Sequence, residues 1–270
     1  PYYGISYFLS LPFLISILYL GNILFSLPLV FLSQIVFCFA AFGLVFLIKS
    51  KESLRQILAH PVFYILPIIG IYFFITPELI YSPTTWDEYS MWLRRPMEIV
   101  LDNAILNPAR HGYEKGYNYT PAANLLLAYP NLLLDQTFSI AHTIKIPLVS
   151  AAALLGLAYD IVHTSIPKKI FIPGILIFAG LFSTLAKVLY PGDVLIESFM
   201  HQSILAMGLC VYAYLKGEIK GWKGLLLIGV VGAYAYLIKA PSALLMPGLL
   251  ITLYLFHFNN WRITTETFFK

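Results

Sequence analysis

Residues 5–25 read ISYFLSLPFLISILYLGNILF, an apolar run that contains no charged side chain. At about 1.5 Å per residue, a helix of this length spans about 30 Å, the thickness of the hydrocarbon core of a bilayer. Similar runs recur along the whole chain. They are interrupted by Pro and Gly, residues that membrane helices tolerate. The stretch therefore predicts a transmembrane helix within an all-α protein.

The composition of the whole chain supports this prediction. Charged residues make up 11% of the 270 residues, against about 25% in an ordinary soluble domain. Hydrophobic residues make up 59%, and the mean hydropathy is +0.79. A water-soluble globular protein is excluded, and the net charge of +4 indicates no nucleic-acid partner because basic residues in membrane proteins mostly report topology.

Apolar windows predict a multi-pass helix bundle of about eight spans. The windows lie at 5–25, 28–48, 61–81, 144–162, 170–190, 194–215, 225–238 and 242–256. Lysines and arginines gather in the loops of one face, at Lys49, Lys51, Arg55, Lys168, Lys169, Lys216, Lys220, Lys223 and Arg262. The positive-inside rule makes this face cytoplasmic. We expect an integral protein of the plasma (inner) membrane whose active face is non-cytoplasmic and whose partners include membrane lipids.

The long stretch 82–143 falls on the opposite, outer side and is too long for a connector. A capping box precedes an amphipathic run at 91–105, which predicts a helix lying along the membrane surface. Further on, Thr120 and Pro121 read as an N-cap followed by Pro at the first helical position. They predict a short apolar helix that continues through Leu134.

An acidic pair, Asp87 and Glu88, lies between two aromatic residues at the start of this outer stretch. Adjacent carboxylates beside an apolar surface disfavour each other's ionisation, which suits a general base facing a hydroxyl acceptor. Glu88 also fits the capping box, so a structural role for it stays open. Asp87 is the stronger candidate for catalysis.

A second polar series, Asp193, Glu197 and His201, has a spacing of four residues and would share one face of a helix that enters the membrane. Such groups normally line a polar cavity. The same spacing can hold a divalent cation, and Asp193 alone can act as an N-cap. We expect cavity or substrate contacts from these three residues and no metal.

Several residues could bind a sugar phosphate. Lys239 precedes a Pro break between two spans, where a cation can meet a lipid phosphate or simply snorkel to the interface. Arg94 and Arg95 could bind the same phosphate, and Tyr117 and Tyr119 could stack on sugar rings, although a solvated loop is the alternative for all four. Phosphate-binding Gly-rich loops, Ser-nucleophile elbows and metalloprotease motifs are absent from the sequence.

Four short motifs on the predicted outer side resemble the GT-C superfamily of polytopic glycosyltransferases. They are Trp86-Asp87-Glu88, Tyr117-Asn118-Tyr119-Thr120-Pro121, Tyr190-x-x-Asp193 and Leu237-Ile238-Lys239. The resemblance is to relatives of protein mannosyltransferases and lipid A aminoarabinose transferases, and it covers roughly residues 61–256. It implies transfer of a sugar from a polyprenyl-phosphate donor to a glycan, lipid or protein acceptor on the non-cytoplasmic face.

The resemblance also implies roles for individual residues. Asp87 would be the base with Glu88 as its neighbour, Asp193 would be a second acid facing the cavity, and Lys239 would lie near the donor phosphate. Positioning and electrostatics would suffice, so no soluble cofactor is expected. The absence of an Asp-x-Asp pattern argues against a metal-dependent subtype, although a divalent cation stays possible.

This interpretation divides the chain into three parts. Two N-terminal spans and a basic loop occupy 1–60, the GT-C-like module with its outer catalytic loop occupies 61–256, and a cytoplasmic-side tail occupies 257–270. We expect the tail to be truncated and the chain to be a piece of a longer protein. The alternative functions are a transporter or lipid flippase, in which His201 and its neighbours would form an ion path, and an oligosaccharide ligase.

Overall fold

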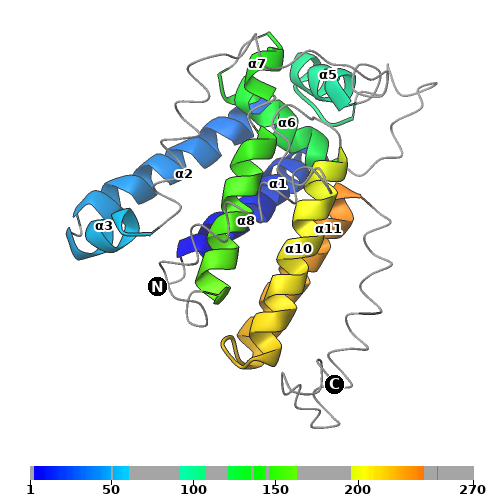
Figure 1. The fold of residues 1–270 in the computed structure, drawn as a ribbon. Helices are drawn as coiled ribbons and strands as arrows, with labels where there is room; N and C mark the ends of the chain where they lie inside the picture. The colour runs from blue at the N-terminus through cyan, green and yellow to red at the C-terminus, as the bar shows by residue number, and fades with distance from the viewer. Residues whose placement is uncertain are drawn as a thin grey trace.

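The computed structural model describes residues 3–49, 51–60, 92–106, 121–134, 137–143, 146–162, 196–239 and 248. Every regular element in these ranges is a helix (Figure 1). The helices are α1 (Tyr3–Phe25), α2 (Leu29–Lys49), α3 (Lys51–Leu58), α5 (Arg94–Asp102), α6 (Ala122–Leu133), α7 (Ile140–Thr143), α8 (Ile146–Val162), α10 (Ile196–Leu215) and α11 (Gly221–Ile238). The all-α prediction is confirmed for the described part of the chain.

Within these ranges, three helices are long and apolar enough to cross a membrane: α1, α11 and the Leu29–Phe46 part of α2. Shorter apolar stretches occur in α6, α8 and α10. The membrane-helix character of the chain is therefore confirmed. The predicted windows 61–81, 170–190 and 242–256 lie outside the described residues apart from Gly248, so the count of eight spans stays a prediction.

The long helix α1 lies at the centre of the described bundle and packs against α8, α2, α6 and α11. Its buried side chains recur every three or four residues, as Phe8, Leu11, Ile15 and Leu18 illustrate. This spacing places them on one face of the helix. On that face the Phe8 ring meets the ring of Tyr234 from α11 edge-to-face, with centroids 5.8 Å apart.

Two glycines allow α1 and α8 to touch. A Cβ atom added at Gly4 of α1 would overlap the carbonyl group of Gly156 in α8. Small residues at a crossing let the backbones of membrane helices approach closely. As a result, the first turn of α1 lies directly against the last turns of α8.

The second half of α2 extends away from the other helices (Figure 1). Its large apolar side chains are exposed, and Phe39 and Phe42 are 70% and 63% exposed. Such a surface is costly in water, but it suits contact with lipid tails. The exposure pattern of α2 therefore agrees with its span-like composition.

The long helices have two distinct ends (Figure 1). We call the end where α5 and α6 lie the α5 end, and the opposite end, where α3 and the turn between α10 and α11 lie, the α3 end. At the α5 end, Asn103 accepts hydrogen bonds from the first residues of α2: its carbonyl from Leu29 N–H at 3.2 Å and its Oδ1 from Val30 N–H at 2.8 Å. Asn22 Oδ1 of α1 accepts one from Ile105 N–H at 2.9 Å. These bonds attach α5 to the turn between α1 and α2.

Helix α6 is buried on most of its circumference and packs against α5, α1, α2 and α11. It follows Pro121, whose carbonyl accepts a hydrogen bond from Leu125 N–H at 2.9 Å. The helix ends at Leu133, so the structure agrees with the predicted bounds to within one residue. An apolar helix surrounded in this way belongs to the core and not to the surface.

Candidate functional site

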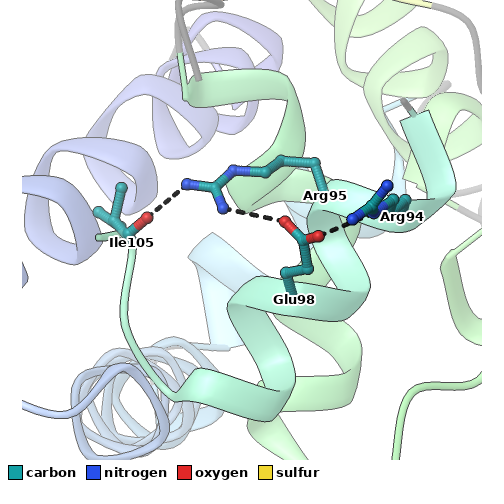
Figure 2. Close-up of polar contacts among 4 residues, drawn as sticks. All are labelled: Arg94, Arg95, Glu98 and Ile105. Carbon is teal, nitrogen blue, oxygen red and sulfur yellow. Dashed lines mark hydrogen bonds and ion pairs between the residues drawn. The ribbon is translucent and has the colours of Figure 1, made fainter. Parts of the chain in front are cut away.

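Helix α5 carries an ion cluster around one buried glutamate (Figure 2). Glu98 Oε1 accepts a hydrogen bond from Arg94 Nε at 2.9 Å, and its Oε2 accepts one from Arg95 Nη1 at 3.2 Å. The two arginines precede Glu98 by four and three residues, a spacing that brings side chains together on one helix face. One carboxylate thus faces two guanidinium groups.

The two arginines differ in their surroundings. The Arg94 side chain is 48% exposed, whereas that of Arg95 is only 13% exposed. Arg95 Nη2 also donates a hydrogen bond of 2.6 Å to the carbonyl oxygen of Ile105, so it joins the two ends of the α5 segment (Figure 2). Arg95 therefore also has a structural role, and Arg94 offers the more accessible cation for a phosphate.

A small cavity of about 120 Å³ lies beside this cluster, between α1, α5 and α6. Its walls are largely apolar and include Ile23 and Ile99, while Arg95, Asn124 and Tyr19 supply polar atoms. Ligand pockets commonly combine apolar walls with a few placed polar groups. The cavity is below the range of about 300–1,000 Å³ for drug-sized ligands, so it suits one small polar group or a few water molecules.

The polar atom of most interest in this cavity belongs to Asn124 in the first turn of α6. The residue is 3% exposed, and its Oδ1 has no hydrogen-bond partner within the described part of the chain. A buried acceptor left without a partner costs about 1–3 kcal/mol, so native proteins rarely retain one without a reason. This unsatisfied acceptor next to a cavity makes Asn124 a candidate functional residue.

A second asparagine of the same helix shows the opposite situation. Asn131 is fully buried, its Nδ2 donates to Thr143 Oγ1 at 3.1 Å, and its Oδ1 accepts from Ser139 N–H at 2.8 Å. Both halves of its amide are used to attach the segment that contains α7. Asn131 is therefore structural, and it provides an internal reference for Asn124.

Lys239 and His201 lie on other helices. Lys239 follows the last residue of α11 at the α5 end, and its N–H donates to Ala235 O at 3.1 Å. His201 lies in α10, next to Gln202, whose Nε2 donates to Pro147 O at 3.3 Å. The Nδ1 atom of His201 is buried and has no hydrogen-bond partner among the described residues. Of the predicted phosphate ligands, the structure brings Arg94 and Arg95 together.

The remaining predicted site residues cannot be placed. Asp87, Glu88, Asp193, Tyr117 and Tyr119 lie outside the described residues, and so does the side chain of Glu197. Their roles stay predictions. Across the described ranges, no group of three or more His, Cys, Asp or Glu side chains could hold a metal ion.

A buried histidine–aspartate pair at the α3 end is not evident from the sequence. His60 Nε2 donates to Asp160 Oδ1 at 3.0 Å, and Asp160 Oδ2 accepts from Ile5 N–H of α1 at 2.9 Å. The ring of Tyr159 packs edge-to-face on His60 at 4.8 Å. One signal was available, because Asp160 is the single charged residue of the apolar helix α8 and such residues usually have a partner.

No family model, curated protein or solved structure matches this chain. Function therefore has to be inferred from the residues of the chain itself and from their arrangement.

Proposed function

We propose that the protein is a membrane glycosyltransferase that transfers a sugar from a polyprenyl-phosphate donor to a glycan, lipid or protein acceptor at the non-cytoplasmic face. Asp87 is the base in this proposal, and Arg94, Arg95 and Lys239 bind the donor phosphate. The cavity beside α5 holds one hydroxyl-bearing part of a substrate. The sequence motifs that resemble the GT-C superfamily provide the reaction class.

The observation that carries the proposal is a small cavity beside the ion cluster that Arg95 and the buried Asn124 both line. Amide and guanidinium side chains are groups that form hydrogen bonds with sugar hydroxyls. The volume of about 120 Å³ suits one hydroxyl-bearing group of a substrate and not a whole sugar ring. A pocket of this composition supports recognition of a neutral polyol next to a charged phosphate.

The distribution of basic side chains supports the proposed orientation. Lys49, Arg55, Lys216, Lys220 and Lys223 belong to the segments at the α3 end. Loops rich in Lys and Arg remain on the cytoplasmic side of a membrane. This pattern favours an α5 end on the opposite side, where a polyprenyl-phosphate donor would present its phosphate at headgroup depth.

The proposed reaction is a single displacement with inversion. The carboxylate of Asp87 takes the proton of the acceptor hydroxyl while the acceptor oxygen forms a bond to the anomeric carbon of the sugar. The bond from that carbon to the phosphate oxygen breaks, and its electron pair leaves with the polyprenyl phosphate. The arginines of the α5 cluster stabilise the charge that grows on the departing phosphate.

The direct test is transfer or hydrolysis of sugar by the purified full chain in nanodiscs, with a panel of radiolabelled polyprenyl-phosphate monosaccharides. We expect turnover with at least one donor and a loss of about 100-fold or more for Asp87→Asn, because a general base contributes about that factor. A folded protein that is silent across the whole panel would contradict the glycosyltransferase proposal. An active Asp87→Asn variant would contradict the role of Asp87 alone.

The cavity is tested separately with Asn124→Leu, which removes the amide oxygen while keeping a similar volume. We expect turnover to fall about tenfold, the equivalent of one lost hydrogen bond of about 1.4 kcal/mol. Arg94→Lys is the control outside the cavity, because it keeps the positive charge and changes only the geometry of the cation. Its KM for the donor should change more than its kcat. Unchanged turnover in Asn124→Leu would remove the cavity from the substrate site.

One observation favours a second function, that of an ion-coupled transporter. His201 presents a buried Nδ1 without a partner in the described part of the chain, and ionisable groups inside membrane helices often form proton paths. Proteoliposomes with a trapped pH-sensitive dye would report proton flux under an imposed gradient. Flux that disappears in His201→Gln would favour the transporter, whereas absence of flux in the wild-type protein would leave the glycosyltransferase.

A further inference from the structure

An open groove of about 710 Å³ runs between α1 and α11. Helix α11 contributes Lys223, Leu226, Leu227 and Val230, which are spaced by one, three or four residues and therefore share one helix face. The facing wall belongs to α1 and includes Phe13 and three serines. The volume lies within the range of about 300–1,000 Å³ that is typical of ligand pockets.

Two of the three serine hydroxyls on this wall are already used by α1 itself. Ser10 Oγ donates to the carbonyl oxygen of Tyr7 at 2.6 Å, and Ser16 Oγ donates to that of Pro12 at 2.8 Å. Because these hydroxyls bond to their own helix, they do not require hydrogen bonds from an occupant. Together with Leu226 and Val230, they line a groove that can accept a hydrocarbon chain.

The groove lies within one leaflet of the bilayer. From Lys223 to Val230, α11 rises about 10 Å at 1.5 Å per residue. One leaflet contributes about 15 Å of hydrocarbon, half of the total of about 30 Å. The apolar part of the groove therefore has the depth of a lipid acyl chain that enters from the α3 end.

The mouth of the groove carries positive charge at headgroup depth. Lys223 is exposed there, and its neighbour Trp222 is 69% exposed. Exposed Trp residues mark the level of the headgroups in membrane proteins. The turn between α10 and α11 carries Lys216, Glu218 and Lys220, so its formal charge is positive, and none of the residues that line the groove is acidic. This charge is complementary to a lipid phosphate.

We propose that this groove binds one anionic phospholipid of the membrane leaflet at the α3 end. An acyl chain fills the space between α1 and α11, and the headgroup phosphate pairs with Lys223. The site is at the end of the bundle opposite the α5 cluster, so it is separate from the proposed donor site. Its occupant belongs to the bilayer and takes no part in sugar transfer.

The test is native mass spectrometry of the full chain, delipidated in detergent and titrated with phosphatidylglycerol or phosphatidylcholine. We expect one tightly bound phosphatidylglycerol and weaker binding of phosphatidylcholine. Lys223→Gln should weaken the binding of phosphatidylglycerol about fivefold, since one basic residue contributes about 1 kcal/mol to anionic lipid binding. Lys220→Gln is the matched control, because Lys220 is exposed on the same turn but does not line the groove.

Two further variants test the groove itself. Ser10→Phe places a ring in the groove and should displace the tightly bound lipid, whereas Leu225→Phe adds the same ring on the exposed face of α11 that does not line the groove and should not. Equal losses for Lys223→Gln and Lys220→Gln would overturn the proposal in favour of diffuse attraction. Unchanged phosphatidylglycerol binding in a monodisperse Ser10→Phe protein would also overturn it.

Discussion

The two ends of the helix bundle each contain a deeply buried polar residue, but only one of these residues has a hydrogen-bond partner for every side-chain oxygen. At the α3 end, Asp160 is 4% exposed and uses both carboxylate oxygens, one for His60 and one for the N–H of Ile5. At the α5 end, Asn124 is equally buried, and its Oδ1 has no partner within the described ranges. A polar group with all its hydrogen bonds made stabilises the fold, whereas a buried one without a partner needs another explanation, such as a functional role.

The largest expected effect on stability comes from removing the carboxylate of Asp160 at the α3 end. Asp160→Ala leaves His60 and the N–H of Ile5 without their acceptor, and we expect the free energy of unfolding to fall by about 3–5 kcal/mol. Unfolding in mixed micelles would measure it. Asp160→Asn, which retains one carbonyl oxygen, should lose less stability. A loss below about 1 kcal/mol in Asp160→Ala would mean that the carboxylate of Asp160 does not hold α1 against α8.

A smaller loss is expected at the ion cluster of the α5 end. Glu98→Gln removes the charge that compensates Arg94 and Arg95, and we expect a loss of about 2 kcal/mol because hydrogen bonds to charged groups contribute about that much. The same unfolding assay measures it. If Arg95→Gln restored stability in the double variant, the loss would be confirmed as arising from an uncompensated cation. Equal stability of Glu98→Gln and wild type would show that the cluster is dispensable.

The comparison becomes sharpest within α6, where two buried asparagines lie two turns apart. Asn131→Leu removes an amide that makes two hydrogen bonds and leaves the Ser139 N–H without its acceptor, and we expect a loss of about 2 kcal/mol. The fall in thermal unfolding temperature measures this loss. A stable Asn131→Leu protein would show that α7 is held by other contacts.

The smallest expected effect has the opposite sign. Asn124→Leu replaces an unpartnered amide by an apolar side chain, and we expect a gain of about 1 kcal/mol in protein purified without substrate. Thermal unfolding beside Asn131→Leu gives the comparison. A clear loss of stability in Asn124→Leu would mean that its Oδ1 is already bonded in the native protein and is not available to a ligand.

The sequence predicted the elements that depend on local composition. Apolar windows located α1, α2, α8, α10 and α11, because a span needs about 20 apolar residues in succession. The Pro at the start of a helix located α6. The spacing of Arg94, Arg95 and Glu98 also allows the ion cluster to be read from the sequence. From the sequence, both arginines are nevertheless interpreted as phosphate ligands and are not paired with Glu98.

The cavity and the histidine–aspartate pair could not be predicted in the same way. His60 and Asp160 are 100 residues apart, and Ile5 and Asp160 are 155 apart, so no sequence spacing relates them. Asn124 reads as an ordinary polar residue of an apolar helix. Its lack of a partner depends on where α1 and α5 lie around it.

The sequence by itself determined that the chain is helical and apolar enough for a membrane, since both properties follow from the length and composition of single segments. Its basic residues also indicated which loops share a side. Only the tertiary structure decided which buried polar groups obtain partners, because hydrogen bonds between helices depend on how closely their backbones approach. At Gly4 and Gly156 the backbones touch and both carboxylate oxygens of Asp160 are bonded, while beside Asn124 the helices leave a cavity and its Oδ1 has no partner among the described residues.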